Sequence, residues 1–322
     1  MDIFTHFLMA IFISIYTLYF LPFSIVLYAV ILAVIPDFDI ILEPLRRIKK
    51  SNFLSHKGLS HSLFSAFAFS FITTIIFTII TKEDFFIAWI MGFLFYSLHI
   101  LLDFVAASKI PIFYPFSKKR YRFFIDRAIN FPLALVSGLI LLFYTLIFFF
   151  LPQLFFSNLY NYFFGFYITY FSYRIVSKIW IQTRLPPSAL YIPGVIPFTY
   201  LIYEKINTEN SDTFRLKKKI QFMKKNHIIF ESKLLKTPED LKFYDKAIDL
   251  AKDYVFFTKW VAIIPVIKKS NDQCTVILIL AESYFRKSVY GLKVIFNRRS
   301  ELVEQISEGF NIFRLLSNFT IS

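Results

Sequence analysis

The sequence predicts an α-helical polytopic membrane protein of about six short helices, followed by a C-terminal cytoplasmic α+β domain. Three observations lead to this fold class. The 322-residue chain is 57% hydrophobic and only 18% charged, whereas soluble domains are about 25% charged. Long apolar stretches recur up to about residue 181. Beyond Ile181 the composition becomes mixed and polar, with patterns typical of both helix and strand.

The apolar stretches give the order of the helices. Residues 3–36 contain no Asp, Glu, Lys or Arg, and they exceed the roughly 20 residues that cross a bilayer. Pro22 interrupts this stretch, so we expect a hairpin of two short helices, with a shallow or re-entrant hairpin and a total of five spans as the alternatives. The expected helices are Ile3–Phe20, Phe23–Ile35, Ser62–Thr81, Phe85–Ala106, Phe131–Leu151 and Asn158–Trp180.

The distribution of charge predicts the orientation in the membrane. The loops 37–61 and 107–130 hold most of the Lys and Arg residues of the first 181, and the opposite turns hold almost none. Loops rich in Lys and Arg face the cytoplasm, so we expect a multi-pass protein of the inner (cytoplasmic) membrane with its C-terminal domain in the cytoplasm. The net charge of +14 suits anionic phospholipid of the bilayer and does not require nucleic acid as a partner.

The C-terminal part divides into a membrane-proximal linker, 182–203, and the α+β domain, 204–322. The Thr-Pro-Glu-Asp run at 237–240 predicts the start of a helix. Residues 270–272 predict a turn between two strands, and Glu301–Leu316 is expected to form an amphipathic helix. The role of this domain stays open between regulation, recruitment of a partner and contact with lipid. Its protein partner is not predicted. The expected strands are Trp260–Ile267, Cys274–Leu280 and Ser288–Phe296.

Several classes of site are excluded by the composition. The sequence contains neither the P-loop motif nor the glycine-rich dinucleotide-binding motif. Cys274 is the single cysteine, which excludes an intramolecular disulfide and a CxxC zinc site. Any metal ion must therefore be held by histidines and carboxylates.

Histidines and carboxylates gather in the first 103 residues, at helix ends that we expect on the cytoplasmic side. His99 and Asp103 are four residues apart and project from one helix face. Ionisable groups in membrane segments are costly and usually functional. A divalent ion would remove much of this cost, and imidazole with carboxylate suits Zn²⁺, Mn²⁺ or Fe. The seven candidates are His6, Asp37, Asp39, His56, His61, His99 and Asp103.

Each candidate also has a simpler interpretation. His6 could be solvated at the interface, and the acids that follow Pro36 could cap a helix end. Ser60 could cap the third helix, and His99 could form a hydrogen bond with Asp103 without any metal. Because all seven gather on one side, we favour a site for one or more ions, with some groups orienting the ligands or acting as a base.

The order of these motifs resembles the YdjM-type family. Its members are membrane-bound metal-dependent hydrolases, also described as LexA-binding inner-membrane hydrolases. The family pattern is a His near the start, then P-D-x-D, then H-R-G-x-T-H-S, then H-x-x-x-D followed by a W/Y-P-F segment. The corresponding runs here, within residues 1–120 of a domain 1–181, are Pro36–Asp39, His56–Ser62, His99–Asp103 and Pro111–Phe116.

The resemblance implies roles for individual residues. The family is similar to the zinc-dependent phospholipase C and P1 nuclease group, which implies phosphoester hydrolysis with zinc as the first candidate metal. Asp39, His56 and Lys57 are the implied catalytic residues, with His56 a ligand or the proton carrier. Lys57 stands where the family has Arg, so it keeps the charge but loses bidentate geometry. Ser60 replaces a Thr, and Ile40 stands where the family often has His. The implied metal ligands are His6, Asp37, Asp39, His61, His99 and Asp103.

We therefore expect a metal-dependent hydrolase that acts on a phosphoester, either an anionic phospholipid or a lipid-linked phosphate at the membrane. The alternative is a non-enzymatic metal-binding scaffold or regulator whose tail binds a partner. A metal-free lipid phosphatase with a phosphohistidine is disfavoured because residues 85–98 contain no Arg. A transporter is disfavoured because the sequence shows no internal repeat.

Overall fold

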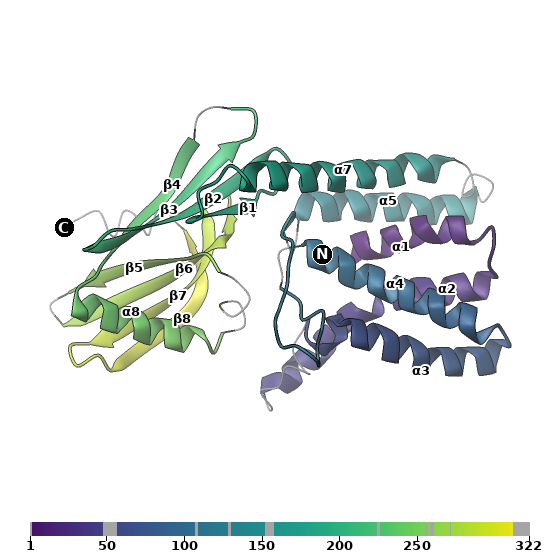
Figure 1. The fold of residues 1–322 in the computed structure, drawn as a ribbon, viewed down its shortest axis with the longest axis horizontal. Coiled ribbons are helices and arrows are strands. Elements are labelled where there is room, and N and C mark those ends of the chain that lie inside the picture. The colour runs from purple at the N-terminus through teal and green to yellow at the C-terminus, as the bar shows by residue number, and fades with distance from the viewer. Residues whose placement is uncertain are drawn as a thin grey trace. The chain divides into compact units, whose positions relative to one another are not determined.

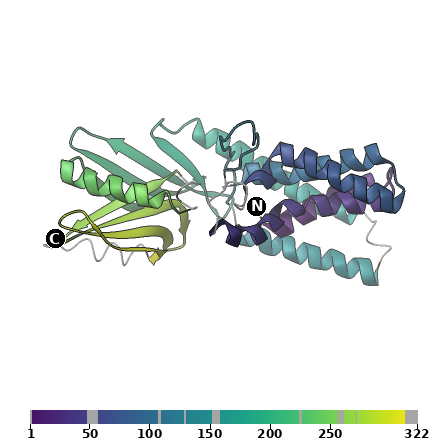
Figure 2. The same ribbon diagram turned by 90° about the horizontal axis from the view of Figure 1, so that it is seen from below.

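The computed structural model describes residues 2–47, 57–106, 109–127, 130–151, 158–223, 226–254, 257, 261–270 and 272–311, with the backbone alone at 42–47. The chain forms two compact units, Met1–Ile175 and Val176–Ser322. The first unit is helical, and the second is built mainly of strands (Figure 1, Figure 2).

The six predicted helices are all present, and each begins within one residue of the expected position. The last of them continues past the end of the first unit. Two stretches of 3₁₀ helix, Ile35–Arg47 and Leu59–His61, lie between the second and third helices. The helices are α1 (Ile3–Thr17), α2 (Phe23–Leu32), α3 (Leu63–Thr81), α4 (Phe85–Val105), α5 (Phe131–Phe150) and α7 (Leu159–Gln182).

Loop residues determine where the helices begin. Pro22 precedes α2 and separates it from α1, as predicted. The cap of α3 is Ser62, whose hydroxyl oxygen accepts a hydrogen bond from the backbone N–H of Ser65 at 3.1 Å. The alternative that Ser60 caps this helix is wrong, because Ser60 lies inside the preceding 3₁₀ turn and donates its hydroxyl to Asp39.

Three helices, α3, α4 and α5, are long and apolar enough to cross a membrane. α2 and residues Ile35–Ile41 together qualify as a fourth span, bent by 42° at the break between them. α1 has only 15 residues, and α7 is more polar, with Arg174 and Lys178 in its second half. The described part of the chain thus contains three or four membrane-length helices, fewer than the six expected spans.

Close packing between helices forms the core of the first unit. α2 and α4 approach each other at Gly92, where a Cβ atom would lie 2.7 Å from Leu32 and 3.0 Å from Tyr28. α1 and α5 meet through the rings of Phe12 and Tyr144, whose centroids are 5.8 Å apart. A further buried apolar cluster contains residues of α1, α2 and α4 and holds these three helices together. The described candidate ligands other than His61 lie at or just beyond the ends of these helices.

The buried charge on α7 is paired. Arg174 is 0% exposed, and its Nη2 lies 3.4 Å from Oδ1 of Asp126. Asp126 also accepts hydrogen bonds from Asn130 and Tyr170. This polar cluster ties α7 to the segment just before α5, and its groups are satisfied mainly by one another.

Two four-stranded antiparallel sheets make up most of the second unit, in the orders β1-β2-β3-β4 and β5-β6-β7-β8. Consecutive strands pair, so each sheet is a meander. Helix α8 (Pro238–Ala251) packs on the second sheet through Phe243 and Ala247. The strands are β1 (Ala189–Pro193), β2 (Thr199–Asn207), β3 (Ser211–Ile220), β4 (Asn226–Leu235), β5 (Ile263–Lys269), β6 (Gln273–Phe285), β7 (Ser288–Asn297) and β8 (Leu302–Asn311).

The C-terminal predictions are confirmed in part. Thr237 caps α8 by accepting a hydrogen bond from the N–H of Asp240, and the three expected strands are β5, β6 and β7. The predicted helix Glu301–Leu316 is wrong over the described residues, which form β8. Pairing with β7 along its length overrides the helical pattern there. The sequence predicts none of the first sheet, whose β1 and the start of β2 lie within the expected linker 182–203.

Candidate metal centre

The segments that carry the predicted ligands meet at one end of α4. His99 and Asp103 lie about one turn apart near that end and are 1% and 0% exposed. His61 ends the 3₁₀ turn before α3 and is also fully buried. Asp37 lies in the 3₁₀ helix that follows α2. Residues far apart in the sequence therefore converge, as their positions at helix ends on one side lead us to expect.

Four donor atoms face one another in this cluster. One atom each from Asp37, His61, His99 and Asp103 lies within 4.8 Å of the others. The two imidazole Nε2 atoms are 3.3 Å apart, and His61 Nε2 is 3.0 Å from Oδ2 of Asp103. Oδ1 of Asp37 lies 3.6 Å from His99 Nε2 and 3.8 Å from His61 Nε2. Ligands about 2.0–2.1 Å from a tetrahedral Zn²⁺ are about 3.3 Å apart, so the donor set fits a divalent ion.

Hydrogen bonds behind the two rings determine which nitrogen faces the cluster. His99 Nδ1 donates to the carbonyl oxygen of Ala33 at 2.8 Å, which directs the Nε2 lone pair inward. His61 Nδ1 lies 3.0 Å from Oγ of Ser60 and 3.4 Å from Oδ2 of Asp39. Such oxygen atoms commonly support metal-binding imidazoles. With both Nδ1 atoms protonated, the two Nε2 atoms at 3.3 Å require a cation between them, either a proton or a metal ion.

Lys57 brings a buried positive charge to the cluster. Its Nζ lies 2.6 Å from Oδ2 of Asp103, and its side chain is 7% exposed. Burial lowers the pKa of Lys57, but the charge and hydrogen bond of Asp103, with the charge of Asp37, raise this pKa above its usual value. Burial also lowers the pKa of His61, and its hydrogen bonds to the surrounding carboxylates raise that pKa to about 9. A metal ion would therefore have to displace a proton from His61.

Asp39 lies behind His61 and outside the group of four donors. Its Oδ2 accepts hydrogen bonds from the backbone N–H of Lys57, at 3.0 Å, and from the hydroxyl of Ser60. Lys57 adopts a left-handed backbone conformation, with φ of 59°, which costs a non-glycine residue about 1–2 kcal/mol. The contacts to Asp39 and to the cluster offset this cost. Asp39 is thus placed to orient His61 and its loop, and its role as a metal ligand stays a prediction.

His6, on α1, lies beside the four donors without joining them. Its ring stacks on that of His99, with centroids 3.9 Å apart and planes inclined by 14°. Its Nε2 lies 3.4 Å from Oδ1 of Asp103. Neither ring nitrogen forms a hydrogen bond with any residue that the structure describes, although His6 is only 1% exposed. Because an unsatisfied buried imidazole is costly, His6 is a candidate ligand for a second ion shared with Asp103.

Two groups near the centre, the Ala33 carbonyl and the Tyr96 hydroxyl, are not predicted by the sequence. His56 lies outside the described residues. The carbonyl of Ala33, which orients His99, has no sequence signature because every residue has a carbonyl group. Tyr96 donates its hydroxyl to the carbonyl of Ser60 at 2.9 Å, and its position one turn before His99 is a signal that could have identified it.

The most accessible carboxylates here are Asp37, in the cluster, and Asp39, behind His61, whose side chains are 14% and 11% exposed. The basic segment 109–127 folds next to the loop that carries Lys57. In this segment Ile110 pairs with Tyr121, and Nη1 of Arg120 lies 3.5 Å from the carbonyl oxygen of Lys57. Positive charge therefore lies close to the candidate metal centre.

Comparisons with known proteins give one match. A family model described as YdjM inner membrane protein matches residues 1–181. No curated protein and no solved structure matches the chain. The matched range contains all of the predicted ligands, and it ends one residue before α7 does.

Proposed function

The chain belongs to the YdjM inner membrane protein family, and on this premise we propose that it is a membrane-bound metal-dependent hydrolase that cleaves a phosphoester in a lipid-linked substrate. One observation carries the proposal. Two imidazole nitrogens and two carboxylate oxygens, from three separate segments of the matched range, lie within 4.8 Å of one another in a buried site.

The residues around the four donors provide what phosphoester hydrolysis requires. A divalent ion held there would lower the pKa of water to about 7 and polarise a phosphoryl oxygen. Lys57 and Arg120 provide positive charge against an anionic group. Asp39 and the carbonyl of Ala33 hold the imidazole rings in position, which limits reorganisation during the reaction. His56 stays the predicted metal ligand or proton carrier.

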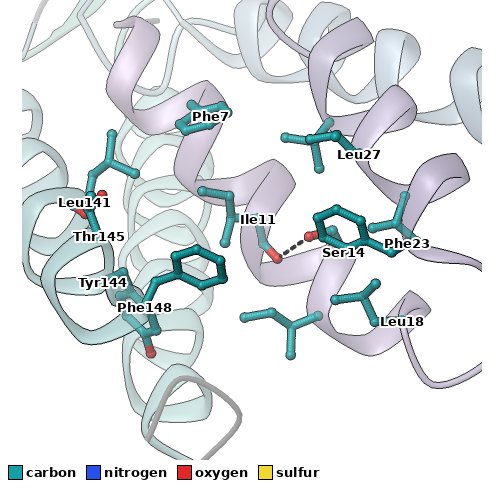
Figure 3. Close-up of a pocket in the computed structure, with 13 residues that line it drawn as sticks. Phe7, Ile11, Ser14, Leu18, Phe23, Leu27, Leu141, Tyr144, Thr145 and Phe148 are labelled. Atoms are coloured by element: carbon teal, nitrogen blue, oxygen red, sulfur yellow. Dashed lines mark hydrogen bonds between the residues drawn. The ribbon is translucent and has the colours of Figure 1, made fainter. Parts of the chain in front are cut away.

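An apolar groove near the cluster supports a substrate with an acyl or prenyl chain. Its first part is lined by Phe7 together with Ile35 and Phe38, residues close to Asp37 in sequence. Phe7 and Leu141 also line a second part, so the two parts adjoin. Figure 3 shows the second part between α1, α2 and α5. Apolar linings of this kind hold hydrocarbon chains, while a few polar groups fix the reacting end.

The metal content of the full-length protein in detergent tests the proposal. We compare wild type with Asp37→Ala/His99→Ala, and with His227→Ala as a matched control because His227 is exposed on β4. Wild type and control should each retain about one divalent ion or more per chain, and the double variant should retain almost none. Bis-p-nitrophenyl phosphate and long-chain phosphatidic acid then serve as substrates. Near-zero metal in all three proteins would overturn the proposal.

A metal-binding scaffold without enzymatic activity is the second candidate. It is favoured by the ion pair of Lys57 with Asp103, because this lysine already balances a buried carboxylate without a metal ion. The second unit also lies almost wholly outside the family match, and it could bind a partner. Bound metal without turnover of phosphomonoesters or phosphodiesters would support this candidate and exclude the hydrolase.

A further inference from the structure

One end of the first sheet exposes a group of large apolar side chains. The β1–β2 turn and the β3–β4 turn lie together at this end, because Thr199 at the start of β2 pairs with Ile220 at the end of β3. We call residues 194–198 and 221–223 the sheet tip. Its rings at Phe198 and Phe222 have centroids 6.0 Å apart. The exposed fractions are 56% for Ile196, 47% for Phe198, 76% for Phe222 and 57% for Met223.

The charges next to the tip are positive. Lys217, Lys218 and Lys219 occupy the end of β3, and residues 194–202 and 216–223 contain no Asp or Glu. Lys217 pairs with Glu204, whereas the other two lysines form no ion pair with a described residue. An apolar end flanked by unpaired lysines complements a surface that is anionic outside and apolar beneath.

Hydrogen bonds fasten the tip to the last turns of α7. Ser177 donates its hydroxyl to Oε1 of Gln221 at 2.8 Å, and the N–H of Gln221 donates to the carbonyl of Phe198 at 2.8 Å. Trp180 is 43% exposed on these turns, and the guanidinium of Arg184 lies 4.1 Å from its ring centroid. An exposed Trp with a neighbouring Arg is typical of a membrane interface. In the sequence, α7 begins in the helical unit at Leu159 and ends in the second unit at Gln182.

We propose that the sheet tip inserts into the headgroup region of an anionic phospholipid bilayer and docks the second unit on the membrane. A group of large apolar side chains that is exposed on a protein surface usually marks an interaction site. The surrounding lysines and the contact with α7 select lipid as the occupant over a protein partner. This docking does not depend on the metal centre, so it stands or fails independently of the hydrolase proposal.

Fluorescence quenching by brominated lipid tests the docking. The full-length variant Phe222→Trp is placed in nanodiscs of phosphatidylglycerol and phosphatidylcholine, with or without dibrominated acyl chains. Ile206→Trp is the matched control, because Ile206 is 38% exposed near the opposite end of β2. The three native tryptophans contribute equally to both variants. We expect the tryptophan introduced at the tip to lose more than half of its emission on bromination, and the control tryptophan to lose little.

Reversing the charge of the lysines distinguishes docking of the sheet tip by electrostatic attraction from mere closeness of the tip to the bilayer. Adding Lys218→Glu and Lys219→Glu to the tip variant should remove most of the quenching in phosphatidylglycerol nanodiscs, as should replacing phosphatidylglycerol by phosphatidylcholine. Met223→Trp repeats the test if Phe222→Trp does not fold. Equal quenching at the tip and at Ile206, or no quenching at the tip, overturns the proposal.

Discussion

Substitution of Asp39 separates an orienting residue from a metal ligand. The structure places its carboxylate against Nδ1 of His61, opposite to the nitrogen that faces the cluster. Among the residues that the structure describes, the N–H of Lys57, the hydroxyl of Ser60 and the His61 ring meet this carboxylate. Removing it should therefore weaken metal binding without abolishing it.

The size of the effect follows from what each variant keeps. Asp39→Asn retains an acceptor oxygen for the loop and loses only the negative charge, so we expect about a 10-fold weaker metal affinity. Asp39→Ala also loses the hydrogen bonds that hold Lys57 and Ser60, so we expect a loss nearer 100-fold. These losses correspond to about 1.4 and 2.7 kcal/mol.

Competition with a chromophoric chelator in detergent measures these affinities. Asp249→Asn is the control, because Asp249 is 71% exposed on α8. If Asp39→Asn bound no more metal than Asp37→Ala/His99→Ala, Asp39 would be a direct ligand. If Asp39→Ala kept the wild-type affinity, the orienting role would be refuted.

Three other perturbations test the packing and the charges. Lys57→Met should destabilise the metal-free protein by about 3–5 kcal/mol, because Asp103 loses its buried counter-charge. The melting temperature of this variant should fall in chelator, and added Zn²⁺ should partly restore it. An equal fall with chelator and with Zn²⁺ would contradict this reasoning. The pKa of His61 is raised from 6.5 to about 9. Protonation of His61 therefore stabilises the folded metal-free protein fully below about pH 6.5, and this stabilisation is lost as the pH rises from 6.5 through 9. Melting temperatures in chelator should fall over that range, and a flat profile would contradict the assignment. Gly92→Val should lower the free energy of unfolding by about 1–3 kcal/mol, because the new side chain would meet α2. Gly165 has open space around it, so Gly165→Ala should stabilise α7 by about 0.5–1 kcal/mol. Similar melting temperatures for the two variants would refute the packing argument.

The helices could be predicted from the sequence because their signals are local. Pro22 interrupts an uncharged stretch, and apolar runs of membrane length specify α3, α4 and α5. The first sheet could not be predicted in the same way. Its strands are mixed in polarity, and the buried residues of β3 are followed by three consecutive lysines, Lys217 to Lys219, in a pattern that also suits a solvated loop. Pairing with the neighbouring strands decides such strands, as it does for β8.

The sequence alone determined the chemistry of the candidate site: which histidines and carboxylates exist, that no cysteine joins them, and that His99 and Asp103 share a helix face. Only the tertiary structure decided how these groups are divided. It placed four donors together, Asp39 behind His61, His6 to one side and the ammonium of Lys57 on Asp103. The physical reason is that ligand geometry depends on how α1, α2 and α4 pack and on backbone groups such as the Ala33 carbonyl, and neither is encoded in the spacing of residues along the chain.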